Sequence, residues 1–130
     1  MVARRKIKLD VGREAVAAVQ AALAEGQLVF ADSQVSGSPQ LTTAVRFLLE
    51  ELAARAPGNS VEVRVPPLGA TQCIEGPRHT RGTPPNVVEM TAETWFALAT
   101  GSLAWHEASA AGKISASGTR ADISEVLPLF

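Results

Sequence analysis

The sequence predicts an α+β or mixed α/β fold, because its predicted strands are grouped between predicted helices instead of alternating with them. Two long stretches carry apolar residues at helical spacing. A block between residues 60 and 90 holds the strand patterns, and two shorter helical patterns follow it. This order is typical of a layered domain. The chain of 130 residues is long enough for a core of its own, so we expect residues 1–130 to form a single domain.

The first predicted helix begins at the string LDVGRE and is rich in alanine. Asp10 can cap its first free amide groups, and Gly26 is placed to end it in a left-handed turn. Its apolar stripe is narrow and consists of Val16, Val19 and Leu23. Residues 28–30, Leu-Val-Phe, can add a short strand. We therefore expect an N-terminal helix and linker over residues 10–39.

The second predicted helix is the clearest element of the chain. Ser38 and Pro39 have the residue types of a helix cap and of the first helical position. Pro57 ends the pattern, because a proline cannot continue a helix. One continuous apolar face follows the helical spacing and consists of Leu41, Ala44, Val45, Leu48, Leu49, Leu52 and Ala53.

Three strands are predicted after this helix. Residues 60–67 alternate strictly, which is typical of a half-buried strand in an antiparallel or mixed sheet. Their apolar face consists of Val61, Val63 and Val65. Their polar face consists of Glu62 and Arg64. Residues 69–76 alternate less clearly, and residues 86–90 form the third predicted strand.

The rest of the chain predicts two short helices and one more strand. Thr91 is the expected N-terminal cap of a helix over residues 91–101, and Gly101 is its expected C-terminal cap. Ser102 is the expected cap of a second helix over residues 102–112. Residues 113–118 return to the alternation of a strand. An apolar tail follows, in which a proline prevents a long helix.

Composition and charge argue against several classes of partner. Twelve Lys and Arg residues against thirteen Asp and Glu residues leave a net charge of −1, so no overall field favours nucleic acid. One local exception is a basic N-terminal arm over residues 1–9, which we expect to be solvated. No apolar run approaches the roughly 20 residues that cross a bilayer, so we expect no stable membrane insertion. Cys73 is the only cysteine, which favours a reducing, cytoplasmic location.

From residue 40 onward the sequence resembles the sterol carrier protein family, and most closely its bacterial orthologues. The strings VRVPPLGATQCIEGPRHTRGTPPNVVE, EMTAETWFALATG and AGKISASG carry the likeness. They are also similar to the sterol-carrier-like C-terminal domain of mycothiol-dependent maleylpyruvate isomerase-type proteins. The resemblance implies a sterol-carrier-like core over residues 40–130. Its fold would be α+β, a mixed sheet of roughly four to five strands with helices packed on one face and an apolar cavity between the layers.

Apolar residues of the C-terminal half are candidates for lining such a cavity. The candidate ligand-binding residues are Trp95, Phe96, Leu98, Leu103, Trp105, Val126, Leu127, Leu129 and Phe130. Alanines lie beside both tryptophans, and small residues next to large ones either interdigitate or leave a void. An ordinary core is the alternative interpretation of the same residues, and both stay open. In the cavity hypothesis the last apolar residues act as a movable lid.

Residues 73–86 concentrate polar side chains and support several hypotheses. A clamp for the carboxylate or phosphate head group of a ligand would consist of Arg64, Arg78, His79 and Arg81. A nucleophilic Cys73 would need an imidazole within hydrogen-bond reach. A zinc site would need three or four ligands at defined spacing, which this stretch lacks, so we expect no metal. The simplest interpretation is a loop between strands, shaped by glycines and prolines.

The leading functional hypothesis is a non-enzymatic binding or carrier domain for an apolar small molecule that resembles a lipid or fatty acid. One alternative is an interaction or regulatory module that works with a separate catalytic partner chain, because His79 and His106 cannot supply a metal site by themselves. A less favoured alternative is a thiol enzyme that uses Cys73. No phosphate-binding or dinucleotide fingerprint occurs, so we expect no cofactor. A free sheet edge leaves a homodimer open.

Overall fold

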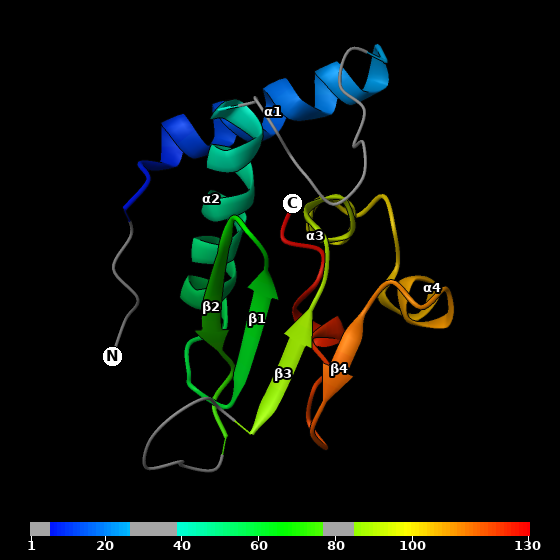
Figure 1. Ribbon diagram of the computed structural model, residues 1–130. Helices are drawn as coiled ribbons and strands as arrows, with labels where there is room; N and C mark the ends of the chain where they lie inside the picture. The colour runs from blue at the N-terminus through cyan, green and yellow to red at the C-terminus, as the bar shows by residue number, and fades with distance from the viewer. Residues whose placement is uncertain (1–5, 27–38, 77–84) are drawn as a thin grey trace.

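A mixed sheet with helices against one face forms the frame of the protein (Figure 1). The structure, a computed structural model, describes residues 6–26, 39–76 and 85–130. Within these residues the sheet has four strands in the order β2-β1-β3-β4. The predicted α+β class is therefore confirmed. The short strand expected at residues 28–30 lies outside the described residues.

The strand β1 (Val61–Val65) lies at the centre of the sheet. It pairs antiparallel with β2 (Gly69–Cys73) on one side and parallel with β3 (Asn86–Glu89) on the other. The short strand β4 (Ser115–Ser117) pairs antiparallel with β3 and forms one edge of the sheet. The sheet is mixed because β1 and β3, which are not consecutive in sequence, run in the same direction.

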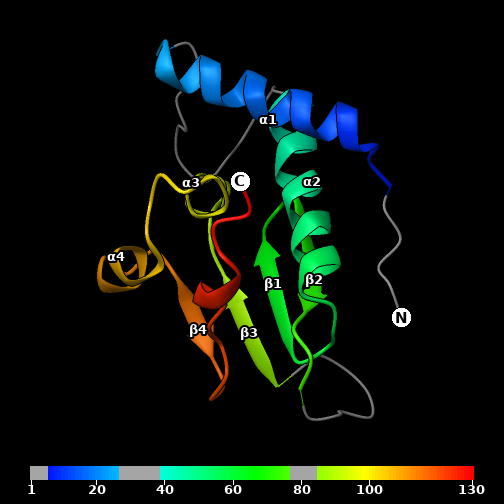
Figure 2. The same cartoon turned by 180° about the vertical axis from the view of Figure 1, so that it is seen from behind.

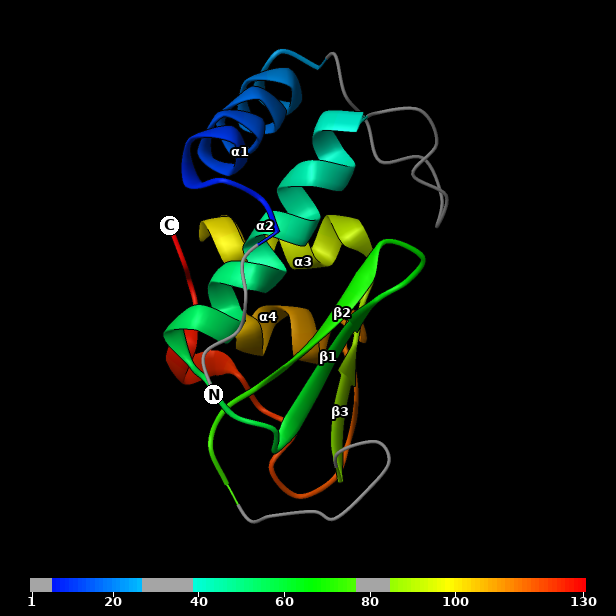
Figure 3. The ribbon, with the colours of Figure 1, turned by 90° about the vertical axis from the view of Figure 1, so that its left-hand side faces the viewer.

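The alternation predicted for β1 is confirmed. Its three valines are fully buried, and they face the helices. Glu62 and Arg64 lie on the opposite face, where the two side chains form an ion pair. Figure 3 shows the helices on one side of the sheet, and none of the described helices covers the other side. The inward valines therefore supply the sheet's share of the core.

The helix α2 (Pro39–Arg55) lies against the inner face of the sheet. Every residue of its predicted apolar face is buried, and Phe47 is buried with them. The next helix, α3 (Ala92–Thr100), is joined to α2 by a hydrogen bond in which Trp95 Nε1 donates to the Val45 carbonyl oxygen at 3.3 Å. The indole thus fills core volume and also satisfies its polar atom, as a buried tryptophan requires.

The caps predicted for α3 are confirmed. Thr91 Oγ1 accepts a hydrogen bond from the Thr94 amide at 3.2 Å, which satisfies one of the free donors of the first turn. Gly101 ends the helix in the left-handed region with a φ of 85°. A residue without a Cβ takes up this conformation at little cost.

Two other predicted caps are wrong. The helix α1 (Leu9–Ala24) begins one residue before Asp10, since the Gly12 amide donates to the Lys8 carbonyl oxygen at 2.9 Å. Asp10 thus lies in the first turn, where its charge still complements the helix dipole. The helix α4 (Trp105–Ala110) begins after Ala104 rather than at Ser102, because the backbone that follows α3 first folds back onto the end of that helix.

The helix α1 crosses α2 on the side away from the sheet (Figures 1 and 3). Its inner face is narrow, as predicted, and buries Gly12, Ala15, Val16 and Val19. Gly12 lies directly against the Phe47 ring, so that a Cβ at this position would overlap ring atoms. A glycine, which helix interiors disfavour, is therefore required here by the close approach of the two helices.

The C-terminal segment returns to α3. After a short 3-10 turn (Ser124–Val126), the amides of Leu129 and Phe130 both donate to the Ala99 carbonyl oxygen, at 2.8 and 3.2 Å. This carbonyl belongs to the last turn of α3 and has no acceptor role within that helix. The end of the chain consequently lies between α2 and α3, beneath α1 (Figure 2).

Replacing Gly12 with alanine tests the packing of α1 on α2. The added methyl group overlaps the buried Phe47 ring, and overpacking of this kind costs about 1–3 kcal/mol. Higher helix propensity offsets about 1 kcal/mol. We expect a net loss of about 1 kcal/mol in the free energy of unfolding, measured by urea denaturation. The double variant Gly12→Ala, Phe47→Leu should recover part of the loss, whereas a stabilised single variant would contradict this packing.

Candidate functional site

An open groove runs along α1 on the side where Phe130 lies. It encloses about 450 Å³ and is lined by Arg13, Val16, Ala17 and Gln20 of α1 together with Phe130. The α1 residues recur at intervals of three and four, so they form a single stripe along the helix. We call this hollow the α1 groove.

The α1 groove is apolar in its middle and polar at its ends. Arg13 and Gln20 are seven positions apart, which corresponds to about 10 Å along a helix. Val16 and Ala17 lie between them, and most of the lining consists of carbon atoms. A ligand in the groove would therefore meet apolar surface along its length and hydrogen-bonding groups at both ends.

The wall opposite α1 is the side chain of Phe130, which is held from several directions. Its ring centroid lies 6.0 Å from that of Phe47, with the ring planes tilted by 31°. The guanidinium carbon of Arg55 lies 5.2 Å from the centre of the Phe130 ring, within the range of a cation–π contact. Phe130 as a residue is nevertheless 44% exposed. A large aromatic surface is thus fixed in place and left open to solvent.

One guanidinium at the groove is available to a ligand. Arg55 is engaged with the buried Glu51, whose carboxylate accepts a hydrogen bond from Arg55 Nε at 3.0 Å. Arg13 is exposed and forms no ion pair with any residue that the structure describes. The charge of Arg13 is therefore directed to solvent or to a bound molecule.

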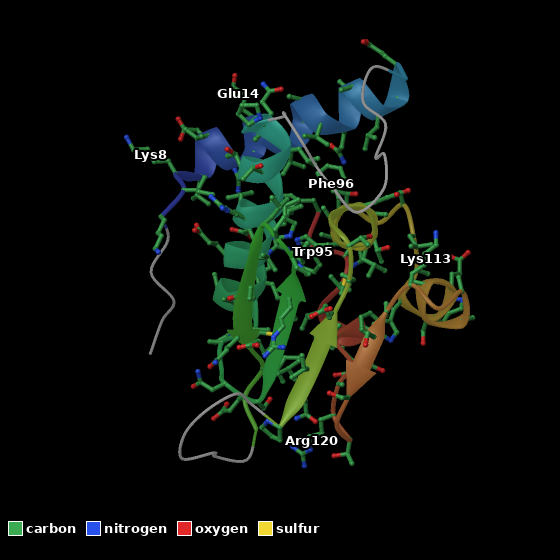
Figure 4. All side chains as sticks on the ribbon, in the orientation of Figure 1. Lys8, Glu14, Trp95, Phe96, Lys113 and Arg120 are labelled. Carbon is green, nitrogen blue, oxygen red and sulfur yellow. The ribbon has the colours of Figure 1, made fainter. Side chains whose placement is uncertain are left out.

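The apolar candidates predicted from the sequence are distributed between core and surface. Trp95, Phe96, Leu98 and Leu129 are almost completely buried, and Figure 4 shows Trp95 between α2 and α3. Four further candidates are half-buried against the same core, namely Leu103, Trp105, Val126 and Leu127. Phe130 is the candidate with the most exposed side chain among them. The structure therefore brings one of the predicted residues, Phe130, to the α1 groove.

One member of the predicted anion clamp lies within the described residues. Arg64 lies on the open face of the sheet and pairs with Glu62, while the buried apolar candidates lie behind the other face. The remaining members, Arg78, His79 and Arg81, lie outside the described residues. The one clamp residue that can be placed is thus separated by the sheet from the core.

Cys73 is a buried, protonated thiol. It ends β2 with no exposed surface, and burial raises its pKa from 9.0 to about 12. A thiol acts as a nucleophile or metal ligand as its thiolate, so a neutral solution leaves this one inert. His106 is exposed on α4, far from Cys73 in sequence. Across the described ranges no group of three or more His, Cys, Asp and Glu residues could hold a metal ion.

A second hollow, of about 320 Å³, is lined in part by Asn86 and Arg120. Figure 4 shows Arg120 at the end of the sheet opposite α1. The buried Asn86 side chain donates to the Ser60 carbonyl oxygen at 2.8 Å and accepts from the Arg120 amide at 2.9 Å. Ser60 Oγ in turn donates to the Ile74 carbonyl oxygen at 2.7 Å. These polar groups join three chain segments, and their hydrogen bonds serve the fold.

The fold defines the class of the protein, an open-sheet α+β domain whose helices cover one face. A family model described as bacterial SCP ortholog matches residues 37–129. The chain therefore belongs to the bacterial branch of the sterol carrier protein family, as the resemblance of its sequence predicts. A search of the curated proteins finds no match. In the described part of the chain, no helix combines the length and apolar character needed to cross a membrane.

All residues that line the α1 groove lie outside the matched range. Arg13, Ala17 and Gln20 were not among the predicted site residues, because a narrow apolar stripe indicates only that α1 packs somewhere. The one sequence feature that could have indicated these groove residues is their position beside Val16 on the same side of the helix. It becomes informative once the partner of α1 is known.

The reactivity of Cys73 tests its burial. We expect iodoacetamide to leave the folded protein unmodified up to about pH 10 and to label it rapidly once urea unfolds the chain. Because the folded pKa is raised to about 12, the unfolded thiol deprotonates first above pH 9.0. The free energy of unfolding should therefore fall as the pH rises, by about 1.4 kcal/mol per pH unit, relative to Cys73→Ala. Fast labelling of the folded protein at neutral pH would contradict this assignment.

Proposed function

We propose that the protein is a non-enzymatic binding or carrier domain for an apolar small molecule that resembles a lipid or fatty acid. The observation that carries the proposal is the α1 groove, which the half-exposed Phe130 lines together with an apolar stripe of α1. Membership of the sterol carrier protein family supports the same class of ligand. The volume of the α1 groove, about 450 Å³, lies in the range typical of small-molecule sites.

Burial of apolar surface would drive binding. An exposed aromatic ring gains about 25 cal/mol for each Å² that a ligand removes from water. Phe130 is already fixed by Phe47, Arg55 and its backbone hydrogen bond, so little side-chain entropy is lost when a ligand covers it. A rigid, exposed aromatic wall is therefore a favourable surface for an apolar chain.

We place the ligand in the α1 groove rather than between the sheet and the helices. Trp95, Leu98 and the inward valines of β1 are completely or almost completely buried there, and close-packed cores contain few voids. In this proposal the other predicted apolar residues belong to the core or pack against it. Phe130 is the predicted residue that contacts the ligand.

The absence of an enzymatic role is part of the proposal, and the protonated state of Cys73 argues against the thiol alternative. A free, buried cysteine is also consistent with the reducing cytoplasm that we propose as its location. The homodimer and the catalytic partner chain stay predictions.

Filling the α1 groove tests this function. Ala17→Trp places a large side chain among the lining residues, and we expect the affinity for a fluorescent fatty-acid probe to fall at least about tenfold, because the apolar surface of the groove is already covered. Ala110→Trp makes the same change at an exposed position on α4 and should leave probe binding unchanged. Both variants should keep the thermal unfolding temperature of the parent, since Ala17 and Ala110 are exposed.

Two results would contradict the proposal. One is a parent protein that shows only its bare chain mass in native mass spectrometry and no saturable binding of the probe. The other is equal binding by the two tryptophan variants, which would place the ligand elsewhere in the molecule.

A further inference from the structure

We infer that the α1 groove selects a single-chain amphiphile with an anionic end, a medium-chain carboxylate whose head group lies at Arg13. The apolar chain would extend past Val16 and Ala17 against Phe130, toward Gln20. This inference rests on the proposed function and adds to it the charge, the orientation and the length of the ligand.

The charge preference follows from Arg13. Arg13 lies at one end of the groove, Gln20 lies at the other, and Arg13 forms no ion pair within the described chain. A guanidinium is a cation that offers paired donors, whose geometry matches a carboxylate. An uncharged ligand of equal length would form no ion pair with Arg13, whose guanidinium donors would then stay hydrogen-bonded to water. An ammonium head group would be repelled.

Acidic neighbours of Arg13 on α1 do not neutralise the groove. Asp10 and Glu14 are exposed, and neither forms an ion pair with Arg13. Glu14 follows Arg13 directly and therefore points about 100° further around the helix. Figure 4 shows Glu14 on the outer side of α1, away from the sheet. The groove side of the helix thus presents the positive charge.

The second guanidinium, that of Arg55, has a different role. It stacks on the Phe130 ring and is paired with Glu51, so this pair contributes little net charge. Of these two arginines, Arg13 is the one whose guanidinium group has no carboxylate partner among the described residues, so a carboxylate ligand would bind there. The head group is therefore expected at the N-terminal end of the α1 stripe, which fixes the direction of the chain.

The length preference follows from the distance between the polar ends. Arg13 and Gln20 are separated by about 10 Å along α1, which a saturated chain of about ten carbons spans. Shorter chains would leave part of the Phe130 ring uncovered. Longer chains would pass the Gln20 amide into solvent and gain little additional burial.

The experiment compares decanoate with decanol, each below its aggregation concentration, by displacement of the fluorescent probe at neutral pH and low salt. We expect decanoate to bind about three- to fivefold more tightly than decanol, the size of effect that an exposed ion pair provides. Arg13→Gln should remove this preference by weakening decanoate while leaving decanol unchanged. Lys113→Gln, which removes a charge beside α4 (Figure 4) at a residue that does not line the groove, should leave both affinities unchanged.

The possible outcomes separate this inference from the function on which it rests. Equal binding of decanoate and decanol, or a preference that survives in Arg13→Gln, would overturn the inference and leave the apolar site standing. Failure of both compounds to bind would contradict the proposed function itself. A preference that disappears equally in Lys113→Gln would show a general charge effect and would also overturn the assignment to Arg13.

Discussion

A single buried ring, that of Phe47, lies against α1 at Gly12 and beside the Phe130 ring, so it supports both walls of the α1 groove. Phe47 lies on α2 with no exposed surface. It occupies the space left by the missing side chain of Gly12 on α1, and its ring lies 6.0 Å from that of Phe130. The two walls of the groove are therefore positioned by the same side chain. Since protein cores are close-packed, a displacement of this ring moves both walls together.

The layers beneath Phe47 explain why it can act as a fixed support. The inward valines of β1 and the apolar face of α2 form one continuous core, to which Trp95 joins α3 through the Val45 carbonyl oxygen. The C-terminal segment then satisfies a carbonyl group at the end of α3, that of Ala99. Without this segment, water would have to donate to the Ala99 carbonyl oxygen. The Phe130 amide donates to it instead, and this hydrogen bond anchors Phe130. Phe130 is therefore held both by packing against the core and by a hydrogen bond to the end of α3.

The polar residues that attract attention in the sequence have structural roles wherever the structure describes them. Cys73 is a small buried side chain whose thiol stays protonated, and Arg64 pairs with Glu62 on the open face of the sheet. The α1 groove, in contrast, lies entirely outside residues 37–129, which match the bacterial branch of the sterol carrier protein family. The α1 wall of the proposed ligand site therefore precedes the family domain, while its Phe130 wall rests on Phe47 and Arg55 of that domain.

Local pattern was sufficient to predict the α+β class, the alternation of β1, the buried face of α2 and the caps Thr91 and Gly101, because burial on one face and free helix-end amides leave a periodic signal. The groove left no such signal. Arg13 and Ala17 are ordinary exposed residues of a helix, and Phe130 is one apolar residue at the end of a tail. Their proximity depends on where α1 and the last residues dock. That was decided in the tertiary structure by Gly12 against Phe47 and by the Ala99 carbonyl group, since contacts between distant segments are independent of local periodicity.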